Sequence, residues 1–273
     1  MSFFSDIFAL DFLSLAFIAT LLVSFVTGLF STVVVLRKIE FIGDGVAHAA
    51  FGGLALGFLI GVNTRLIAIL TAIIFAVVIN LFSKKGYLSE NSMIGILLPL
   101  SMALGIIFLS FVEGYTPDVM SYLFGNILLV SVADIWILAV IAIVSGISFL
   151  LFHREILYYS FDETLARHSG INVPLVNFFV LIGVSVSIVA SVKIAGIILV
   201  TAFLVTPAVI AKRLAKTFKG IVFTAITFSL LSSVLGLWGA YEFEISPGPS
   251  IVVVLFIAFV TVYLITLKRK DIQ

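Results

Sequence analysis

An aspartate and a histidine stand four residues apart, Asp44 and His48, in a stretch that is otherwise small and apolar, GDGVAHAAFGGLALGFLIG. If this stretch is helical, the two positions share one face and their side chains begin about 5–6 Å apart. A carboxylate oxygen and an imidazole nitrogen are both ligands of first-row divalent metals. The pair is therefore a candidate metal site, although it supplies only half of the ligands that a tetrahedral site needs.

The composition places this pair inside a membrane. Apolar residues make up 62% and charged residues 11% of the 273 residues, whereas soluble domains use about 45–50% and about 25%. We expect an all-α polytopic membrane protein with one transmembrane domain over residues 1–273, because the apolar runs leave no room for a separate catalytic domain. The net charge of +1 gives no basis for nucleic-acid binding, and the lack of cysteine excludes disulfides and thiolate metal ligands.

Long apolar runs predict the membrane-crossing helices, since about 17–25 residues are needed to cross a bilayer. The stretch at about 118–133 is too short and interrupted to cross, and is typical of a short or re-entrant helix. Nine runs have a sufficient length, at about 12–36, 41–61, 64–82, 91–112, 134–152, 174–192, 194–211, 219–239 and 249–267.

The basic residues predict the orientation of these helices. If nine helices alternate in direction, 13 of the 15 Lys and Arg residues fall on one side, and only Arg65 and Lys193 fall on the other. Cytoplasmic loops carry an excess of Lys and Arg. We therefore expect a multi-pass protein of the cell membrane with its N-terminus outside and its C-terminus in the cytoplasm.

In the second run, small residues recur at every fourth position: Gly45, Ala49, Gly53, Gly57 and Gly61. This pattern predicts a flat helix surface on which a neighbouring helix packs closely. Asp44 and His48 lie beside that surface, so we expect them to face protein or a cavity. Burial against lipid would cost the aspartate about 2.5–3.5 kcal/mol. A hydrogen-bonded pair that only joins helices is the alternative to an ion pathway, but intramembrane ionisable residues are usually functional.

The longest polar interruption, residues 153–173, falls on the basic side of the membrane. Within it, Ser160 is followed three residues later by Glu163, a capping box that predicts the start of a short amphipathic helix. Gly170 predicts its end. We expect this helix to dock a cytoplasmic partner; an ordinary connecting turn is the alternative.

A proline inside one predicted helix is expected to bend it. Pro207 lies in the run at 194–211, and proline removes a backbone hydrogen bond from a helix interior. The bend is either a fixed kink or a point of movement during gating.

Three segments together resemble the integral-membrane permease subunits of bacterial and archaeal ABC transporters for zinc and manganese: GDGVAHAAFGG, SYLFGNILLVS and KIAGIILVTAFLVTPAVIAKRLA. The resemblance covers nearly the whole chain. It implies a homodimer in which Asp44 and His48 of both subunits line the translocation path and bind the metal. A two-fold axis would then join two half sites into four ligands. Zinc, manganese and iron all stay open.

The resemblance also implies partners. The sequence has no G-x-x-x-x-G-K-[ST] phosphate loop, so we expect no ATPase activity and no tightly bound cofactor in this subunit. Two cytoplasmic ABC ATPase subunits would use ATP to drive alternating access, and an extracytoplasmic metal-binding protein would deliver the metal. The residues that would couple to the ATPase lie in the polar interruption: Ser160, Asp162, Glu163, Ala166 and Gly170.

Three other functions fit a polytopic protein with this pair. A secondary metal transporter would need no ATPase, but the inverted repeats typical of that class are not evident. An intramembrane metalloprotease would need an H-E-x-x-H motif, which is missing. A permease for metal chelates such as cobalamin must fit a large ligand and has little use for an Asp–His pair.

Overall fold

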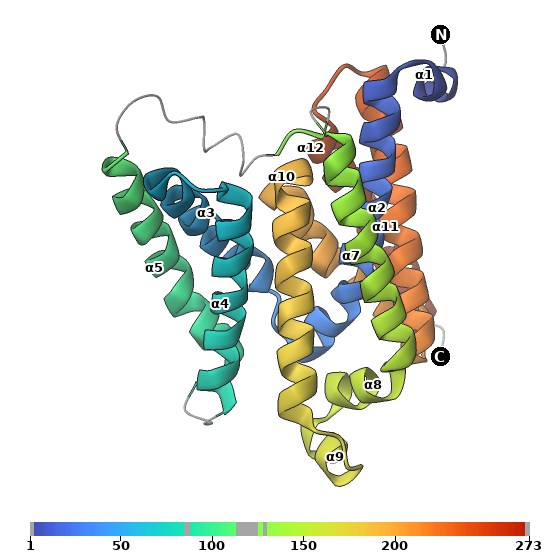
Figure 1. Ribbon diagram of the computed structural model, residues 1–273. Coiled ribbons are helices and arrows are strands. Elements are labelled where there is room, and N and C mark those ends of the chain that lie inside the picture. Colours follow the sequence, from blue (N-terminus) through green and yellow to red (C-terminus); the bar gives the residue numbers. More distant parts are fainter. Residues whose placement is uncertain (1–2, 85–87, 113–124, 128–129, 271–273) are drawn as a thin grey trace.

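The computed structural model describes residues 3–84, 88–112, 125–127 and 130–270, and most of these residues are helical (Figure 1). No strand occurs within these ranges. The helices are α1 (Phe3–Ala9), α2 (Asp11–Arg37), α3 (Ile42–Ile60), α4 (Thr64–Lys84), α5 (Glu90–Ser110), α7 (Val132–Leu151), α8 (His153–Phe161), α9 (Glu163–His168), α10 (Val173–Leu214), α11 (Phe218–Glu242) and α12 (Pro247–Lys270).

Eight helices of the described chain are long and apolar enough to cross a membrane: α2, α3, α4, α5, α7, α10, α11 and α12. This result confirms the expected all-α polytopic membrane protein. The short or re-entrant helix expected at 118–133 lies mostly outside the described residues, and α7 begins at Val132.

Helix α10 contains two of the nine predicted runs. Its 42 residues would form a straight helix of about 63 Å, twice the roughly 30 Å hydrocarbon core of a bilayer. The backbone leaves the helical conformation at Gly196, with φ 76° and ψ 164°. The runs at 174–192 and 194–211 therefore meet at this glycine, three residues after the expected break at Lys193. A bend was predicted at Pro207, which is buried within the second part of α10. The non-helical backbone of α10 lies at Gly196.

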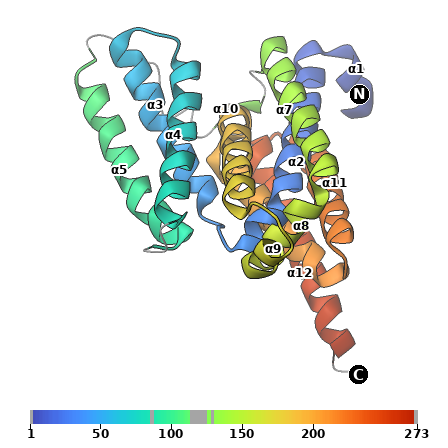
Figure 2. The same ribbon diagram turned by 60° about the horizontal axis from the view of Figure 1, so that its bottom comes forward.

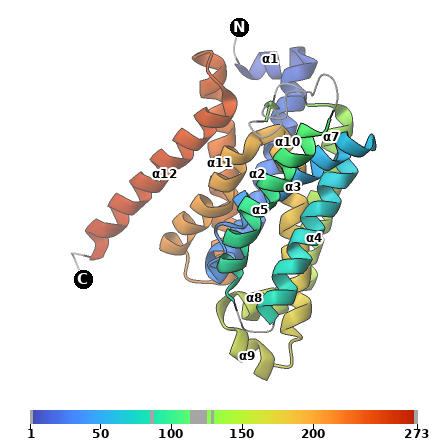
Figure 3. The same cartoon turned by 90° about the vertical axis from the view of Figure 1, so that its left-hand side faces the viewer.

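The helices form two groups on either side of α10 (Figures 1 and 2). Helices α3, α4 and α5 pack together on one side, and α2, α7, α11 and α12 lie on the other. Helix α10 contacts both groups, packing against α2, α3, α4, α7, α11 and α12. The C-terminal part of α12 slants away from the other helices (Figure 3). Helix α10 is thus the central element of the fold.

The small residues of α3 let its neighbours approach closely. A Cβ added at Gly53 would lie 2.1 Å from Thr71 Oγ1 of α4, and one at Gly57 would lie 2.8 Å from Thr64 Cα. Gly45 is likewise closely packed, with Ile94 and Phe75 within 3 Å of an added Cβ, and Ala49 is buried. Gly61 is the exception: it ends α3 in the left-handed conformation, at φ 69°, and no atom lies within 4 Å of an added Cβ.

The polar interruption folds as two short helices rather than the single predicted one. Asp162, and not Ser160, caps α9: its carboxylate accepts hydrogen bonds from the backbone of Thr164 and Leu165, at 2.7 and 3.0 Å. Ser160 lies inside α8, where it is buried and donates to the carbonyl of Ile156. The predicted capping box is therefore wrong, because a carboxylate at the extended residue 162 reaches the free N–H groups of α9 directly.

Gly170 ends this segment as predicted. It has φ 76°, a conformation that favours glycine, and its N–H donates to Arg167 O at 3.1 Å. The N–H of the next residue donates to Ala166 O at 3.1 Å, so the carbonyls at the end of α9 are satisfied by the turn.

Candidate functional site

Asp44 and His48 both lie on α3, near its start, and both are half-buried. Nδ1 of His48 is buried and has no hydrogen-bond partner in the described part of the chain. A pair that only joins helices would need a hydrogen bond or ion pair between its two side chains. No such contact between Asp44 and His48 occurs among the described residues. A buried imidazole nitrogen without a partner normally carries a desolvation cost. A bound cation would remove that cost.

The contacts of neighbouring glycines show which part of α3 carries the pair. Gly43 faces Thr201 and Leu204 of α10, and Gly52 faces the Ser101 carbonyl of α5. With about 100° per residue, Asp44 and His48 project between these two packed surfaces. They are therefore on the side of α3 that lies between α5 and α10, where they stay partly exposed.

One chain does not complete a metal site within the described residues. No group of three or more His, Cys, Asp or Glu side chains there is close enough to hold a metal. Asp44 and His48 supply one oxygen and one nitrogen donor, a set that suits manganese, iron or zinc. Additional ligands are needed for any of these metals.

Two of the five predicted coupling residues, Ser160 and Ala166, are buried, whereas Asp162 and Gly170 are exposed and Glu163 is half-buried. Ala166 is 0% exposed and packs against the core, whereas Leu165 is 52% exposed. Phe161, at the end of α8, is 58% exposed and touches Phe218 edge-on, with ring centroids 6.3 Å apart. A bulky side chain at Ala166 would thus disrupt the fold rather than block an external groove. Leu165 and Phe161 are the apolar side chains of this segment that a partner can reach.

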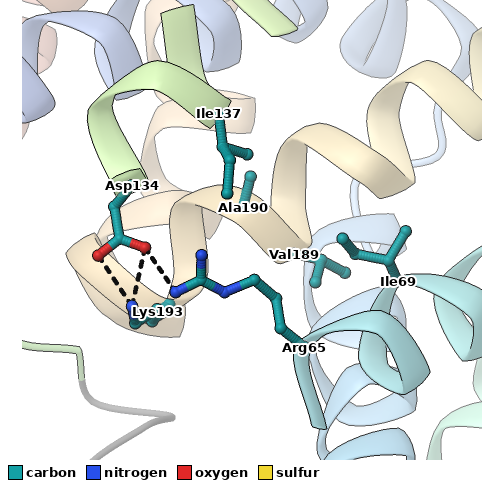
Figure 4. A pocket seen from close by; sticks show the side chains of 7 residues that line it. All are labelled: Arg65, Ile69, Asp134, Ile137, Val189, Ala190 and Lys193. Atoms are coloured by element: carbon teal, nitrogen blue, oxygen red, sulfur yellow. Dashed lines mark hydrogen bonds and ion pairs between the residues drawn. The ribbon is translucent and has the colours of Figure 1, made fainter. Parts of the chain in front are cut away.

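A second polar site, which sequence reasoning missed, joins the start of α7 to α4 and α10 (Figure 4). The start of α7 lies at the end of the molecule opposite to α8 and α9 (Figure 1). The Asp134 carboxylate, at the start of α7, is 5% exposed and binds Arg65 Nη2 of α4 at 2.8 Å and Lys193 Nζ of α10 at 2.8 Å. Ser131 Oγ also donates to it, at 2.7 Å. A signal was present: Arg65 and Lys193 are the two basic residues on the poorly charged side, and S-x-x-D at 131–134 is a capping pattern.

Comparison with known proteins gives a consistent result. The model of the ABC 3 transport family matches residues 9–266. A "Probable metal transport system membrane protein" of Thermotoga maritima is 42% identical over 259 residues, which cover 95% of this chain and 92% of the relative. The "Manganese transport system membrane protein MntC" of Listeria monocytogenes is 32% identical over 269 residues, covering 98% and 96%.

A solved structure has the same fold. It is described as "PsaBC from Streptococcus pneumoniae in complex with Fab", and it matches with a TM-score of 0.83 and 30% identity over 96% of this chain and 94% of that one. The match extends over almost the full length of both chains.

Proposed function

The chain belongs to the ABC 3 transport family and is the membrane permease subunit of a metal-ion importer; we propose that Asp44 and His48 bind the metal in transit. The observation that carries this proposal is the half-buried pair on α3, with its buried and unpartnered imidazole nitrogen. Element analysis of the detergent-purified protein, with and without these two side chains, tests it. Membership in this family sets aside the secondary transporter and the protease considered from the sequence.

Manganese is the cargo that we propose. Several relatives are named as manganese permeases, among them MntC of Listeria monocytogenes and ScaB of Streptococcus gordonii. Oxygen and imidazole donors suit manganese, which takes up to six ligands and readily keeps water among them. Zinc and iron accept the same donors, and binding of either in preference to manganese would correct the assignment.

We propose that two copies of the chain complete the site. The pair lies between the surfaces of α3 that pack on α5 and α10, and is left partly exposed within one chain. A second copy related by a two-fold axis would bring the same two donors to the same ion. The resulting site would contain two carboxylates and two imidazoles, and water would complete the coordination of manganese.

The family also calls for partners that this chain does not contain. An ABC permease works with ATPase subunits, and we propose that two of them bind at the end of the molecule that carries α8 and α9. An extracytoplasmic metal-binding protein would dock at the other end, where the buried Asp134 joins α4, α7 and α10. ATP binding and release would then open the Asp44–His48 site alternately to the two sides of the cell membrane.

Replacing Leu165 with glutamate is expected to release the ATPase from the permease without unfolding it. Leu165 is 52% exposed, so the substitution places a charge in the proposed contact and leaves the core unchanged. Leu214 provides a matched control: it is 47% exposed and lies in the other basic segment, 212–219. Co-purification of the ATPase with each variant measures the effect. Loss of the ATPase from Leu214→Glu but not from Leu165→Glu would move the contact to 212–219.

The orientation of the chain is testable because it has no native cysteine. The N-terminus lies at the end opposite to α8, α9 and the C-terminus (Figure 1). We expect Ser246→Cys to react with a membrane-impermeant thiol reagent in intact cells, and Lys216→Cys to react only after the membrane is opened. Both positions are exposed. The reverse pattern would invert the proposed orientation.

A further inference from the structure

Six polar side chains meet at the end of the helices that carries α8 and α9. We call them the inner polar cluster, and each comes from a different helix: Arg37 (α2), Asn80 (α4), Glu90 (α5), Tyr159 (α8), Glu163 (α9) and Asn177 (α10). The family resemblance assigned no role to five of them, and it placed Glu163 only in the docking segment. Their arrangement joins the docking helices to the rest of the subunit.

Arg37 is the hub of one half of this cluster. Its guanidinium lies over the Tyr159 ring, 4.3 Å from the ring centroid, and Nη1 donates to the Tyr159 carbonyl at 3.4 Å. Nη2 lies 3.8 Å from a carboxylate oxygen of Glu90 and 3.8 Å from one of Glu163. One cation thus holds α8, α9 and the start of α5 to the end of α2.

Tyr159 and Asn177 form the other half. The Tyr159 hydroxyl donates to Asn177 Oδ1 at 2.6 Å, and Asn177 Nδ2 donates to Asn80 Oδ1 at 3.1 Å and to Glu90 Oε1 at 2.9 Å. Tyr159 is fully buried, and this burial raises the pKa of its hydroxyl above the ordinary value, so the hydroxyl keeps its proton and stays a donor.

Three of the helices that the cluster joins pack against α3, the helix that carries Asp44 and His48. Helices α4, α5 and α10 all pack against α3, and α2 leads into it through the short turn after Arg37. The backbones of α8 and α9 pack mainly on α2, α7 and α10. The cluster therefore links the docking helices, through Arg37 of α2 and Asn177 of α10, to α4 and α5, the neighbours of α3 on the other side of the molecule.

A buried polar network of this kind resists partial rearrangement. Each member has partners inside the protein, and separating one element from the others would leave buried donors and acceptors unpaired. A displacement of α8 and α9 is thus expected to move the ends of α2, α4 and α5 with it, rather than to break the contacts one by one.

We propose that the inner polar cluster transmits movement of α8 and α9 to the helices around Asp44 and His48, with Arg37, Tyr159 and Asn177 as positioning residues. This inference rests on the proposed function, because it assigns a route by which an ATPase bound at α8 and α9 controls the metal site. It assigns the cluster no contact with the metal and no contact with the ATPase.

The test removes single links and measures coupling. Tyr159→Phe keeps the ring under Arg37 but removes the hydroxyl donor to Asn177, and Glu90→Gln, on α5 and outside the docking helices, removes one carboxylate charge from Arg37. Two neighbours on α8 serve as matched controls: Tyr158→Phe and Glu155→Gln, for which no hydrogen bond or ion pair of the side chain occurs among the described residues. Permease and ATPase are reconstituted with manganese, and metal transported per ATP hydrolysed is compared with metal bound and with ATPase retained.

We expect each cluster variant to lower the metal transported per ATP by about fivefold, the lower end of coupling between distant sites. Metal binding and ATPase retention should match the unmodified protein, and both controls should transport normally. In the double variant Tyr159→Phe with Asn177→Leu, the loss should be no larger than that of the more severe single change, because both remove the same bond.

Other outcomes separate this inference from the proposed function. Normal metal transported per ATP in both Tyr159→Phe and Glu90→Gln, or an equal loss in the controls, would overturn the role of the cluster and leave the metal site intact. Absence of metal binding by the unmodified protein would instead overturn the proposed function. If Tyr159→Phe lowers the yield of folded protein, Glu90→Gln decides alone, because glutamine has the shape of glutamate and keeps an oxygen that accepts from Asn177 Nδ2.

Discussion

Replacing Asp44 with asparagine, or His48 with alanine, will abolish metal uptake while the subunit still folds and enters the membrane. Both side chains are half-buried, and neither makes a hydrogen bond within the described residues, so the substitutions remove donors rather than packing. Mutation of groups that merely support a metal ligand costs about 10–100-fold. Loss of a ligand itself should therefore lower uptake by about 100-fold or more.

Uptake of manganese by cells, and metal content of the purified protein, measure this effect. Asp11→Asn and His153→Ala are matched controls: Asp11 is exposed at the start of α2, and His153 starts α8, where its ring lies 5.5 Å from that of Phe218. Both controls should take up metal normally. Binding to the unmodified protein should also weaken as the pH falls, because protons compete with the metal for both ligands. Normal uptake by the double variant Asp44→Asn, His48→Ala would end the assignment of the site.

Replacing Gly196 with valine will prevent accumulation of correctly folded permease. Gly196 has φ 76° and ψ 164°, a region that is essentially restricted to glycine and costs other residues about 1–3 kcal/mol or more. A β-branched side chain is among the least tolerant. The backbone of Gly196 is also packed tightly against Gly125, because a Cβ added at Gly125 would overlap Gly196 N. If α10 were straight at Gly196, its second part could not cross back through the membrane.

Yield of monodisperse protein in detergent and its thermal unfolding midpoint measure the effect of Gly196→Val. The matched control is Gly95→Ala on α5, which is exposed, with no atom within 4 Å of an added Cβ. Alanine should be tolerated or slightly stabilising there, because it is a better helix former than glycine. Equal yield and equal unfolding midpoints for the two variants would show that the turn does not depend on the glycine.

The amino-acid sequence by itself determined the features that depend on short-range chemistry. Runs of apolar residues must form helices in a membrane, because no other element satisfies its own backbone hydrogen bonds there. The spacing of Asp44 and His48 places them on one helical face, and Gly53 and Gly57 allow close packing wherever the neighbour comes from. Gly170 ends α9 for a similarly local reason, its positive φ.

Only the tertiary structure decided features that depend on which helices become neighbours. The sequence predicts a break at Lys193, but the turn lies three residues later at Gly196, and nothing in the apolar residues around it marks this glycine. Ala166 is buried because α9 packs on α10, and a six-residue helix has too short a pattern to reveal its inner face. Membrane helices are apolar all round, so their hydrophobic pattern does not identify the face that meets protein.

The polar contacts also separate what the sequence determined from what the tertiary structure decided. Asp134 meets Arg65 across 69 residues of sequence and Lys193 across 59, and Asn177 meets Asn80 across 97. The sequence determined that such buried groups need partners, since an unpaired polar group in an apolar interior is costly. The packing of α4, α7 and α10 decided which partners they have, because a side-chain contact depends on the distance between helices and not on the order of residues along the chain.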